Sequence, residues 1–311
     1  MKKLVIISAV LGLNISNALA CAQGCGVFNV GTSSLIPYQQ GGIAFLQYDY
    51  NAQTKNWHGE NSSTEHNHDK RIETQTITAG AQYMFNRSWG LAARVPYVTR
   101  LVNTIHEEDD GMGGTMDMFK SHRNSEIGDI RLNAIYSGFY DDMSSGLTFG
   151  VKLPTGSTNA KSYNINNQIG TGSTDLLLGA YHVGKIVDVT NLNYFAQASL
   201  DQPVFYKDGY KPGYEISGSI GSSYNFGSVL GLRKLAPIVQ ITASHKGKDS
   251  GSLSHHNLDS GYTQAYFNPA IEIGVGEYRL YADVGFPIYR QVNGNQLVSQ
   301  NTFKVIVGKS F

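Results

Sequence analysis

The sequence predicts an all-β fold: a transmembrane antiparallel β-barrel of about 12 strands, with short periplasmic turns and longer extracellular loops. Three observations lead to this prediction. Many segments alternate polar and apolar residues, which is the period of a strand whose two faces meet different environments. The connections between these segments alternate between short and long along the whole chain. The chain also ends on an amphipathic segment whose last residue is Phe311.

The composition supports a β protein that does not bind nucleic acid. The chain has 35 glycines and 19 tyrosines but only 15% charged residues, which suits a large β fold better than a helical one. The formal net charge is zero, so the composition offers no basic surface for DNA or RNA. We therefore expect no nucleic acid among the partners.

The first 20 residues have the pattern of a secretory signal peptide. Two lysines precede the apolar stretch 4–13, and Ala18-Leu19-Ala20 forms a cleavage site directly before Cys21. Export from the cytoplasm is therefore expected. Because bacterial lipoprotein signals also place a cysteine first in the mature chain, lipidation of Cys21 stays open as an alternative.

Cys21 and Cys25 are the only cysteines of the chain. In an oxidising periplasm, this pair predicts a small disulfide loop. A two-thiolate metal or redox site is the second interpretation, although zinc takes about four ligands and no histidine is nearby. Residues 21–41 contain Gly, Ser, Thr and Pro without clear alternation, so we expect a periplasmic or lumenal segment that could plug a barrel formed by 42–311.

Strands are predicted throughout 42–311. The first three cover 42–51, 72–85 and 89–101. Three more lie within 126–183, where a tight turn at Asp141-Asp142 and a polar loop at 155–172 separate them. The remaining strands are predicted at 192–201, 214–226, 235–246, 262–275, 278–289 and 301–311.

The lengths of the connections distinguish a membrane barrel from a secreted β-sandwich. Short connections are predicted at 86–88, 140–145, 185–191, 227–233 and 276–277, and each is followed by a longer one, such as the loop at 103–125. Outer-membrane barrels have this pattern, with both termini on the periplasmic side. A β-sandwich would show turn signals at more even spacing.

The alternation also assigns the two faces of the wall. Ile130, Leu132, Ala134 and Tyr136 would meet lipid, so the polar residues between them would face the lumen. An Arg or Lys at the lipid midplane costs about 2–4 kcal/mol, which favours the lumen for charged residues. The candidate lining residues are Glu73, Asp129, Arg131, Asn133, Lys152, Asp175, Glu215, Gln240, Glu272, Arg279, Tyr281 and Asp283.

Two interpretations of this lumen set remain open. The residues could form a selectivity lining, or they could pair with one another and fill the interior, as side chains do in small barrels. About 12 strands lie between barrels that are just wide enough to pack and the wider porins with aqueous channels. We therefore expect a narrow, partly plugged conduit.

Histidines in the predicted extracellular loops suggest other chemistry. His66, His68, His255 and His256 could bind a transition metal, although their spacing matches no closed metal site. A hydrolase at the rim would need a Ser or Asp within hydrogen-bonding reach of a loop histidine. Because neither a nucleophile elbow nor a phosphate loop is present, we expect no enzyme activity and no cofactor.

Three motifs resemble the core of a known family. GDIRL at 128–132, TFGVKLPTG at 148–156 and GTGSTDLLLGAY at 170–181 are similar to the MetA-pathway of phenol degradation proteins, which are FadL-like outer-membrane barrels described as transporters. The start of the mature chain, CAQGCGVFNVGTSSLIP, resembles a subgroup of them. The resemblance implies passive uptake of small hydrophobic or aromatic molecules. FadL-type channels carry an N-terminal hatch, a role that it implies for 21–41.

The sequence as a whole leads to one functional hypothesis and one alternative. We expect a channel in the outer membrane of a Gram-negative cell, whose lumen or lateral opening is lined by Tyr, Phe and apolar residues. Its partners would be outer-membrane lipid, a small hydrophobic solute and the barrel-assembly machinery, because the closing strand with Phe311 resembles the signal that this machinery reads. The alternative is a metal-binding or surface-interaction barrel that uses the loop histidines.

Overall fold

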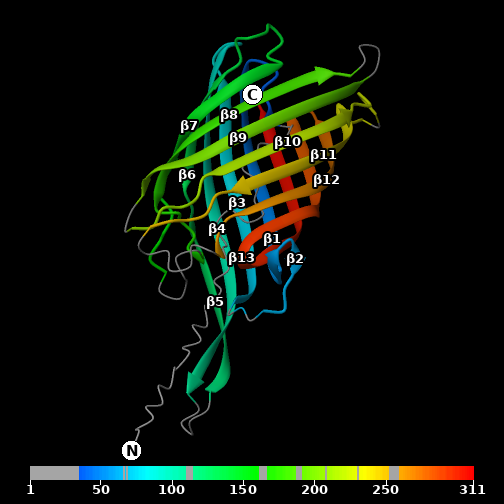
Figure 1. Cartoon of the computed structure of the whole chain (residues 1–311). Helices are drawn as coiled ribbons and strands as arrows, with labels where there is room; N and C mark the ends of the chain where they lie inside the picture. The colour runs from blue at the N-terminus through cyan, green and yellow to red at the C-terminus, as the bar shows by residue number, and fades with distance from the viewer. Residues whose placement is uncertain are drawn as a thin grey trace, which may run out of the picture.

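The computed structural model describes residues 35–65, 67, 69–109, 115–160, 167–186, 191–206, 209–229, 231–251 and 259–311. These residues form one antiparallel sheet that curls into a barrel (Figure 1). Among them, no helix is long and apolar enough to cross a membrane. The strands are β1 Gly41–Gly59, β2 Asn61–Ser62, β3 Asp69–Met84, β4 Trp89–Asp109, β5 Thr115–Ile127, β6 Ile130–Tyr136, β7 Ser145–Leu153, β8 Ser173–Lys185, β9 Leu192–Tyr206, β10 Glu215–Tyr224, β11 Lys234–Lys246, β12 Tyr262–Val275 and β13 Tyr278–Ser310.

The barrel closes because β13 passes through the wall twice. Its first half pairs with β12 and its second half pairs with β1. The chain reverses between them near Gly294, whose φ of 71° is in the left-handed region that glycine adopts without strain. Of the described strands, eleven form the ring, while β2 and β5 lie outside it. Because β13 passes through the ring twice, the wall has twelve passes, the number that the sequence predicts.

The two ends of the barrel differ in their connections. At one end, which we call the turn end, lie the described start of β1, the C-terminus and the tight turns. The predicted turn at 86–88 is confirmed there, with the backbone N–H groups of Ser88 and Trp89 donating to Asn86 Oδ1 at 2.8 Å each. Long connections lie at the opposite end, the loop end. In outer-membrane barrels these ends face the periplasm and the cell exterior, respectively.

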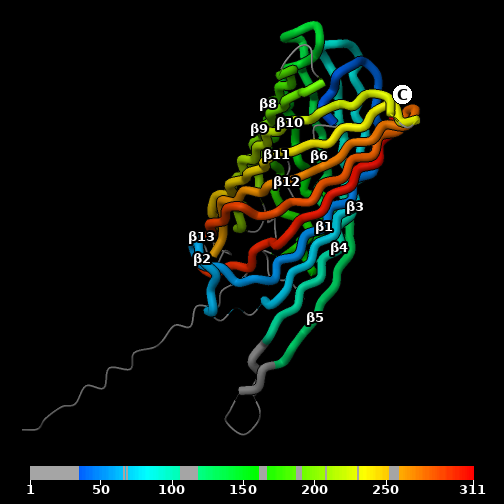
Figure 2. The backbone as a smooth tube through the Cα atoms, turned by 90° about the vertical axis from the view of Figure 1, so that its right-hand side faces the viewer, coloured from blue at the N-terminus to red at the C-terminus, as the bar shows by residue number. Residues whose placement is uncertain are grey.

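The strands extend further at the loop end than predicted. The predicted loop at 103–125 is wrong, because β4 and β5 form a hairpin there that projects beyond the barrel (Figure 2). Cross-strand hydrogen bonds support it: Ser121 Oγ donates to Asn103 Oδ1 at 2.9 Å. The stretch 290–300, which separates the last two predicted strands, is likewise the tip of β13. Polar residues stand at most positions on both faces of these segments, so no apolar alternation marks them in the sequence.

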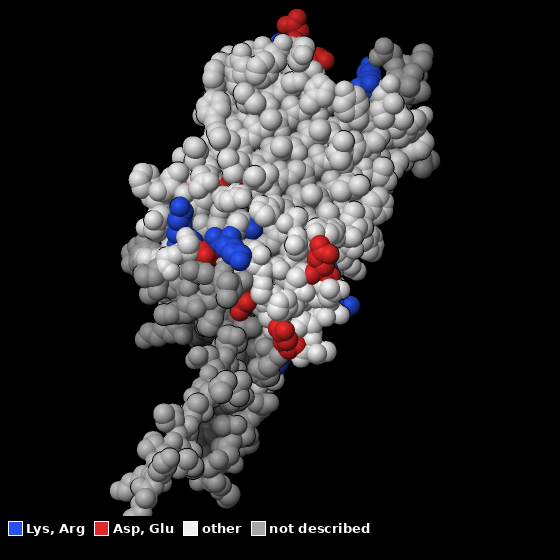
Figure 3. Space-filling model, in the orientation of Figure 1, with Lys and Arg blue, Asp and Glu red and all other residues white. Residues whose placement is uncertain are grey.

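The outer wall is an apolar band. Each strand of the ring presents every second side chain outward, and exposed large apolar residues include Leu46, Ile77, Leu91, Leu132, Phe149, Leu178, Val204, Ile220, Ile241, Ile271, Leu280 and Val307. On the face drawn in Figure 3, charged residues gather near the two ends of the barrel, and the wall between them carries almost none. A soluble protein rarely exposes so large an apolar surface, so this is the outside of a protein that sits in lipid.

Two histidines with hydrogen-bonding neighbours lie on the outer wall near the borders of this band. At the turn end, His182 Nδ1 lies 2.7 Å from Ser145 Oγ and His182 Nε2 lies 3.0 Å from Tyr194 Oη. At the loop end, His245 Nδ1 lies 2.9 Å from Thr263 Oγ1. Aromatic and amphipathic side chains of this kind are typical of the interface between lipid and water.

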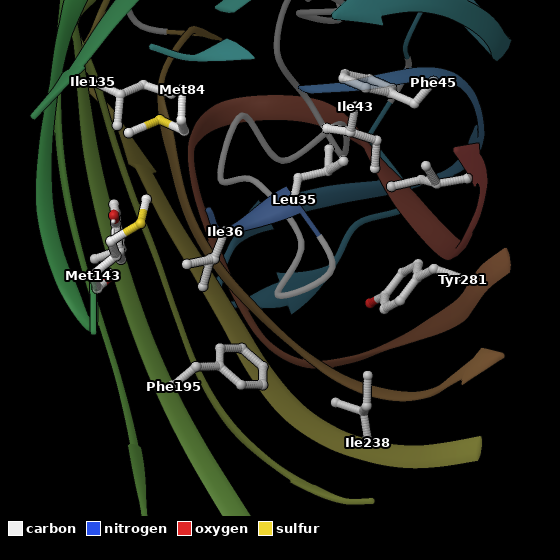
Figure 4. Close-up of a cluster of buried hydrophobic side chains, with 12 residues drawn as sticks. Leu35, Ile36, Ile43, Phe45, Met84, Ile135, Met143, Phe195, Ile238 and Tyr281 are labelled. Carbon is white, nitrogen blue, oxygen red and sulfur yellow. Dashed lines mark hydrogen bonds between the residues drawn. The ribbon is translucent and has the colours of Figure 1, made fainter. Parts of the chain in front are cut away.

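The lumen has a large apolar cluster at the turn end, whereas the loop end is more polar and holds two smaller apolar clusters, around Ile72 and around Tyr262. Leu35 and Ile36 lie inside the barrel, surrounded by inward side chains of the wall (Figure 4). The cluster consists of Leu35, Ile36, Ile43, Phe45, Met84, Ile135, Met143, Tyr181, Phe195, Ile238, Tyr281 and Ile306. The strict assignment of apolar residues to lipid and polar residues to the lumen therefore does not hold at this end.

We predict that a charge in the middle of the apolar band destabilises the barrel far more than the same charge at its edge. Ile271→Arg should lower the free energy of unfolding by about 2–4 kcal/mol, because the guanidinium would lie in lipid. Val275→Arg, on the same face but at the turn-end border, should lower it by only about 0–1 kcal/mol. Denaturant titration of both variants in lipid vesicles measures the difference. Equal losses would contradict the placement of the band.

Candidate channel lumen

Two chambers lie along the axis of the lumen. The turn-side chamber has a volume of about 130 Å³ and is lined largely by apolar side chains, including Leu35, Ile36, Ile135 and Leu177. The loop-side chamber has a volume of about 210 Å³ and a polar lining that includes Asp49, Thr76, Thr78, Lys152, Asp175, Glu215 and Lys246. Because Arg94, Arg131 and Asp201 line both chambers, they mark the boundary between them.

A belt of charged side chains surrounds this boundary. Strand register places Arg94 of β4 opposite Arg131 of β6, and Arg131 opposite Lys152 of β7. Lys152 in turn lies opposite Asp175 of β8. β9 pairs with β8, and from there the register continues along the wall from Asp201 of β9 through Glu215 of β10 to Lys246 of β11.

Most of the charges in the belt are paired. Arg131 Nη2 lies 2.9 Å from Asp201 Oδ2, and Lys152 contacts the carboxylate of Asp175 directly. Lys246 Nζ lies 3.3 Å from Asp249 Oδ1. Buried charges are stable only when they have partners of this kind. Mutual ion pairing therefore accounts for much of the polar lumen.

The predicted lining residues, with one exception, have inward positions in the wall. Asp129, Arg131, Asn133, Lys152, Asp175 and Glu215 line the chambers, and Gln240, Glu272, Arg279, Tyr281 and Asp283 lie on the inward faces of β11 to β13. Glu73 is the exception: Ile72 and Thr74 are the buried neighbours, so Glu73 points outward and pairs with Arg71 at 2.7 Å. The assignment failed because this part of β3 is polar on both faces.

Asp129 holds a segment of chain inside the barrel. Its Oδ1 accepts a hydrogen bond from Gly156 N at 2.9 Å, and its Oδ2 accepts from Thr171 N at 2.9 Å and Thr171 Oγ1 at 2.7 Å. These residues belong to GDIRL, TFGVKLPTG and GTGSTDLLLGAY, so the three motifs meet at one carboxylate. Such hydrogen bonds to a charged acceptor are among the strongest in proteins. We call this arrangement the Asp129 clasp.

The described parts of the connection 154–172 are packed inward from the wall. Gly156 and Gly170 touch backbone to backbone, and a Cβ atom on Gly170 would lie 2.1 Å from Gly156 O. Arg100 donates to the carbonyl oxygens of Asn167 and Gln168, at 3.2 and 2.6 Å. The sequence predicted only a polar loop here. The glycines in PTG and GTG were the only sign in the sequence of this inward packing. The sequence around each glycine does not show that the two touch.

The wall is interrupted where this connection turns inward. β7 ends at Leu153, and among the described strands β5 pairs only with β4, so its other edge has no strand beside it. Thr155 bridges the break: its Oγ1 donates to Gly128 O at 2.8 Å and accepts from Ile130 N at 3.0 Å. Gly128 also lines the loop-side chamber, so this chamber borders the interruption.

The other predicted site residues lie outside the described residues. This applies to Cys21 and Cys25 and to His66, His68, His255 and His256. Within the part of the chain that the structure describes, no group of three or more His, Cys, Asp or Glu side chains is arranged to hold a metal.

Comparison with known proteins supports the fold. No family model and no curated protein matches the sequence. The chain is similar to the crystal structure of the COG4313 outer membrane channel from Pseudomonas putida F1, with a TM-score of 0.66 and 12% identity over 91% of this chain and 100% of that chain. The CymD monoaromatic hydrocarbon channel has a TM-score of 0.47 and 11% identity over 96% and 98% of the two chains, and the translocator domain of autotransporter NalP from Neisseria meningitidis has 0.42 and 12% over 90% and 92%.

The first of these comparisons confirms the predicted fold class. The fold of this chain is that of an outer-membrane β-barrel, in agreement with the expected localisation in the outer membrane. A hydrocarbon channel and an autotransporter domain have similar scores below 0.5, so nothing about function follows from either of them.

We predict that removing the Asp129 clasp opens the loop-side chamber. Asp129→Ala leaves Gly156 N and Thr171 N without their acceptor, so the free energy of unfolding should fall by at least about 1.5–3 kcal/mol, the contribution of one hydrogen bond to a charged group. The single-channel conductance in planar bilayers should rise, because the inward segment loses its anchor.

The control is Asp142→Ala in a turn at the turn end. A hydrogen bond from the hydroxyl of Ser144 lowers the pKa of the Asp142 carboxyl group, but this residue holds no inward segment. This variant should keep the wild-type conductance. If Asp129→Ala also conducts like the wild type, the clasp does not restrict the lumen.

Proposed function

We propose that the protein is an outer-membrane channel through which small hydrophobic or aromatic molecules diffuse passively. The observation that carries this proposal is the apolar turn-side chamber inside a barrel with a lipid-facing exterior. Its volume of about 130 Å³ is close to that of an apolar cavity of about 150 Å³ that binds benzene in an engineered protein. Apolar walls of this kind favour a solute that water does not hold strongly.

The path from the outside passes through the loop-side chamber. Solute enters this chamber either along the axis or sideways, at the interruption between β5 and the end of β7. The unpaired edge of β5 and the chamber residues Pro96, Val98 and Gly128 support the sideways route, because they lie at the loop-end border of the apolar band. A sideways route would let a hydrophobic solute pass between lumen and membrane without crossing the periplasmic end.

Residues 21–41 act as the plug at the turn end. Leu35 and Ile36 support this role, since both are buried at the centre of the lumen among side chains of the wall. Tyr38 stacks on the guanidinium of Arg279, with 4.5 Å between Arg279 Cζ and the ring centroid. These contacts are apolar or cation–π, so the segment can shift without leaving a buried charge unpaired.

The closing strand is proposed to guide assembly of the barrel. Phe303, Val307 and Phe311 are exposed on its outer face, and the backbone of Phe311 forms two hydrogen bonds with Gly42, at 2.8 and 2.9 Å. This exposed apolar edge supports recognition by the barrel-assembly machinery before β1 and β13 join. We propose no enzymatic activity, in keeping with the channel that this fold resembles. No observation on the described residues favours the metal-binding alternative.

We predict that cells producing the protein take up small aromatic solutes faster than cells without it, and that sugars of similar mass gain little. Uptake of labelled compounds from aromatic, aliphatic and sugar series measures this selectivity. Deletion of residues 21–41 should raise uptake of every series, because the turn end loses Leu35 and Ile36. A protein that passes no compound, even after this deletion, is not a channel.

A further inference from the structure

Arg94 is an unusual cation at the boundary of the two chambers. Its guanidinium group lies over the ring of Phe45, with 5.8 Å between Arg94 Cζ and the ring centroid. Among the described residues, no hydrogen bond or ion pair reaches it. Arg131 faces it from β6, so the nearest strand adds a second positive charge. A guanidinium in such a position is stabilised by an anion that binds to it.

The carboxylates around Arg94 already have other partners. Asp201 accepts from Arg131 at 2.9 Å. Asp49, which faces Arg94 from β1, accepts from Gln47 Nε2 at 2.7 Å and lies 3.9 Å from Lys304 Nζ. Asp175 contacts Lys152 and accepts from Ser173 Oγ at 2.6 Å.

Two further carboxylates line the loop-side chamber, and they are also engaged. The Asp129 clasp uses both oxygens of Asp129. Glu215 accepts from Ser217 Oγ at 3.3 Å and from Tyr262 Oη at 3.4 Å. Within the described part of the chain, no carboxylate therefore contacts Arg94 directly, although the charge of Asp49 acts on it from a distance.

The turn-side chamber combines this cation with an apolar space of defined size. Its described lining includes two guanidinium groups and one carboxylate, Asp201, which is paired with Arg131. The remaining lining combines apolar side chains, such as Leu35, Ile36 and Ile135, with uncharged polar ones, and the whole chamber holds about 130 Å³. A cavity of about that size takes one aromatic ring, whereas a long alkyl chain would not fit.

We propose that the boundary between the chambers is a binding site for a single-ring aromatic carboxylate. The ring occupies the turn-side chamber and the carboxylate receives hydrogen bonds from Arg94, with the charge of Arg131 alongside. Arginine suits this role, because its planar guanidinium can donate two parallel hydrogen bonds to one carboxylate. The inference rests on the proposed channel function. It narrows the class of solutes to aromatic anions, because a neutral hydrocarbon could not accept hydrogen bonds from Arg94.

The test compares benzoate with benzamide, which has the same shape and no charge. Calorimetric titration of the full-length purified protein in detergent should show benzoate binding about tenfold to hundredfold more tightly, the effect of hydrogen bonds to a charged group. Arg94→Met should remove this preference and leave benzamide binding unchanged. Arg94→Lys, which keeps the charge without the planar pair of donors, should retain part of it.

The matched control is Arg290→Met. Arg290 is also a partly buried arginine of the barrel, but it lines neither of the two chambers and donates to the carbonyl oxygen of Ser299 at the loop end. It should keep the wild-type preference for benzoate. If Arg94→Met still binds benzamide, the chamber is intact. If this variant does not fold, the ratio of the affinities of the wild-type protein for benzoate and benzamide tests the carboxylate site by itself.

The outcomes separate this inference from the proposed function. Equal affinity of the wild-type protein for benzoate and benzamide overturns the carboxylate site, even if cells take up neutral aromatic compounds. A preference for benzoate that persists in Arg94→Met also overturns it. If aromatic uptake by cells fails while the purified protein binds benzoate through Arg94, the site stands and the channel function is wrong.

Discussion

The structure depends on one constraint: inside lipid, the hydrogen bonds of the backbone must be satisfied by the chain itself. A sheet meets this condition only when it has no free edge, so β1 and the second half of β13 must pair along their length. The two hydrogen bonds between Gly42 and Phe311 complete this seam at the turn end. The unpaired edge of β5 lies where the wall leaves the apolar band, so water can satisfy it.

Closure also determines how the interior is used. The charged side chains excluded from lipid must share a narrow lumen, and there they form the pairs Arg131–Asp201 and Lys152–Asp175. Such pairs fill space and restrict the passage at the same time. The apolar cluster around Leu35 and Ile36 fills the other half of the lumen. The combination of an apolar chamber and a charged boundary is the feature most relevant to function, because it can distinguish solutes by both size and charge.

The Asp129 clasp gives a physical meaning to the motifs by which the sequence resembles a family. Read along the chain, GDIRL, PTG and GTGSTD are a strand start and two turns. In the structure they form one unit in which a carboxylate, two backbone N–H groups and two touching glycines turn the chain into the lumen. This unit also creates the interruption in the wall, because the residues after Leu153 no longer extend β7.

The sequence by itself determined the fold class, the number of passes and the direction of most side chains, because alternation is a local property set by lipid on one side of the wall. It was wrong for Glu73 and for 103–125, where polar residues on both faces remove that signal. Only the tertiary structure decided that Asp129 meets Gly156 and Thr171, or that Arg94 adjoins an apolar chamber beside Leu35. These contacts join distant residues across the lumen, and the curvature of the closed barrel brings them together.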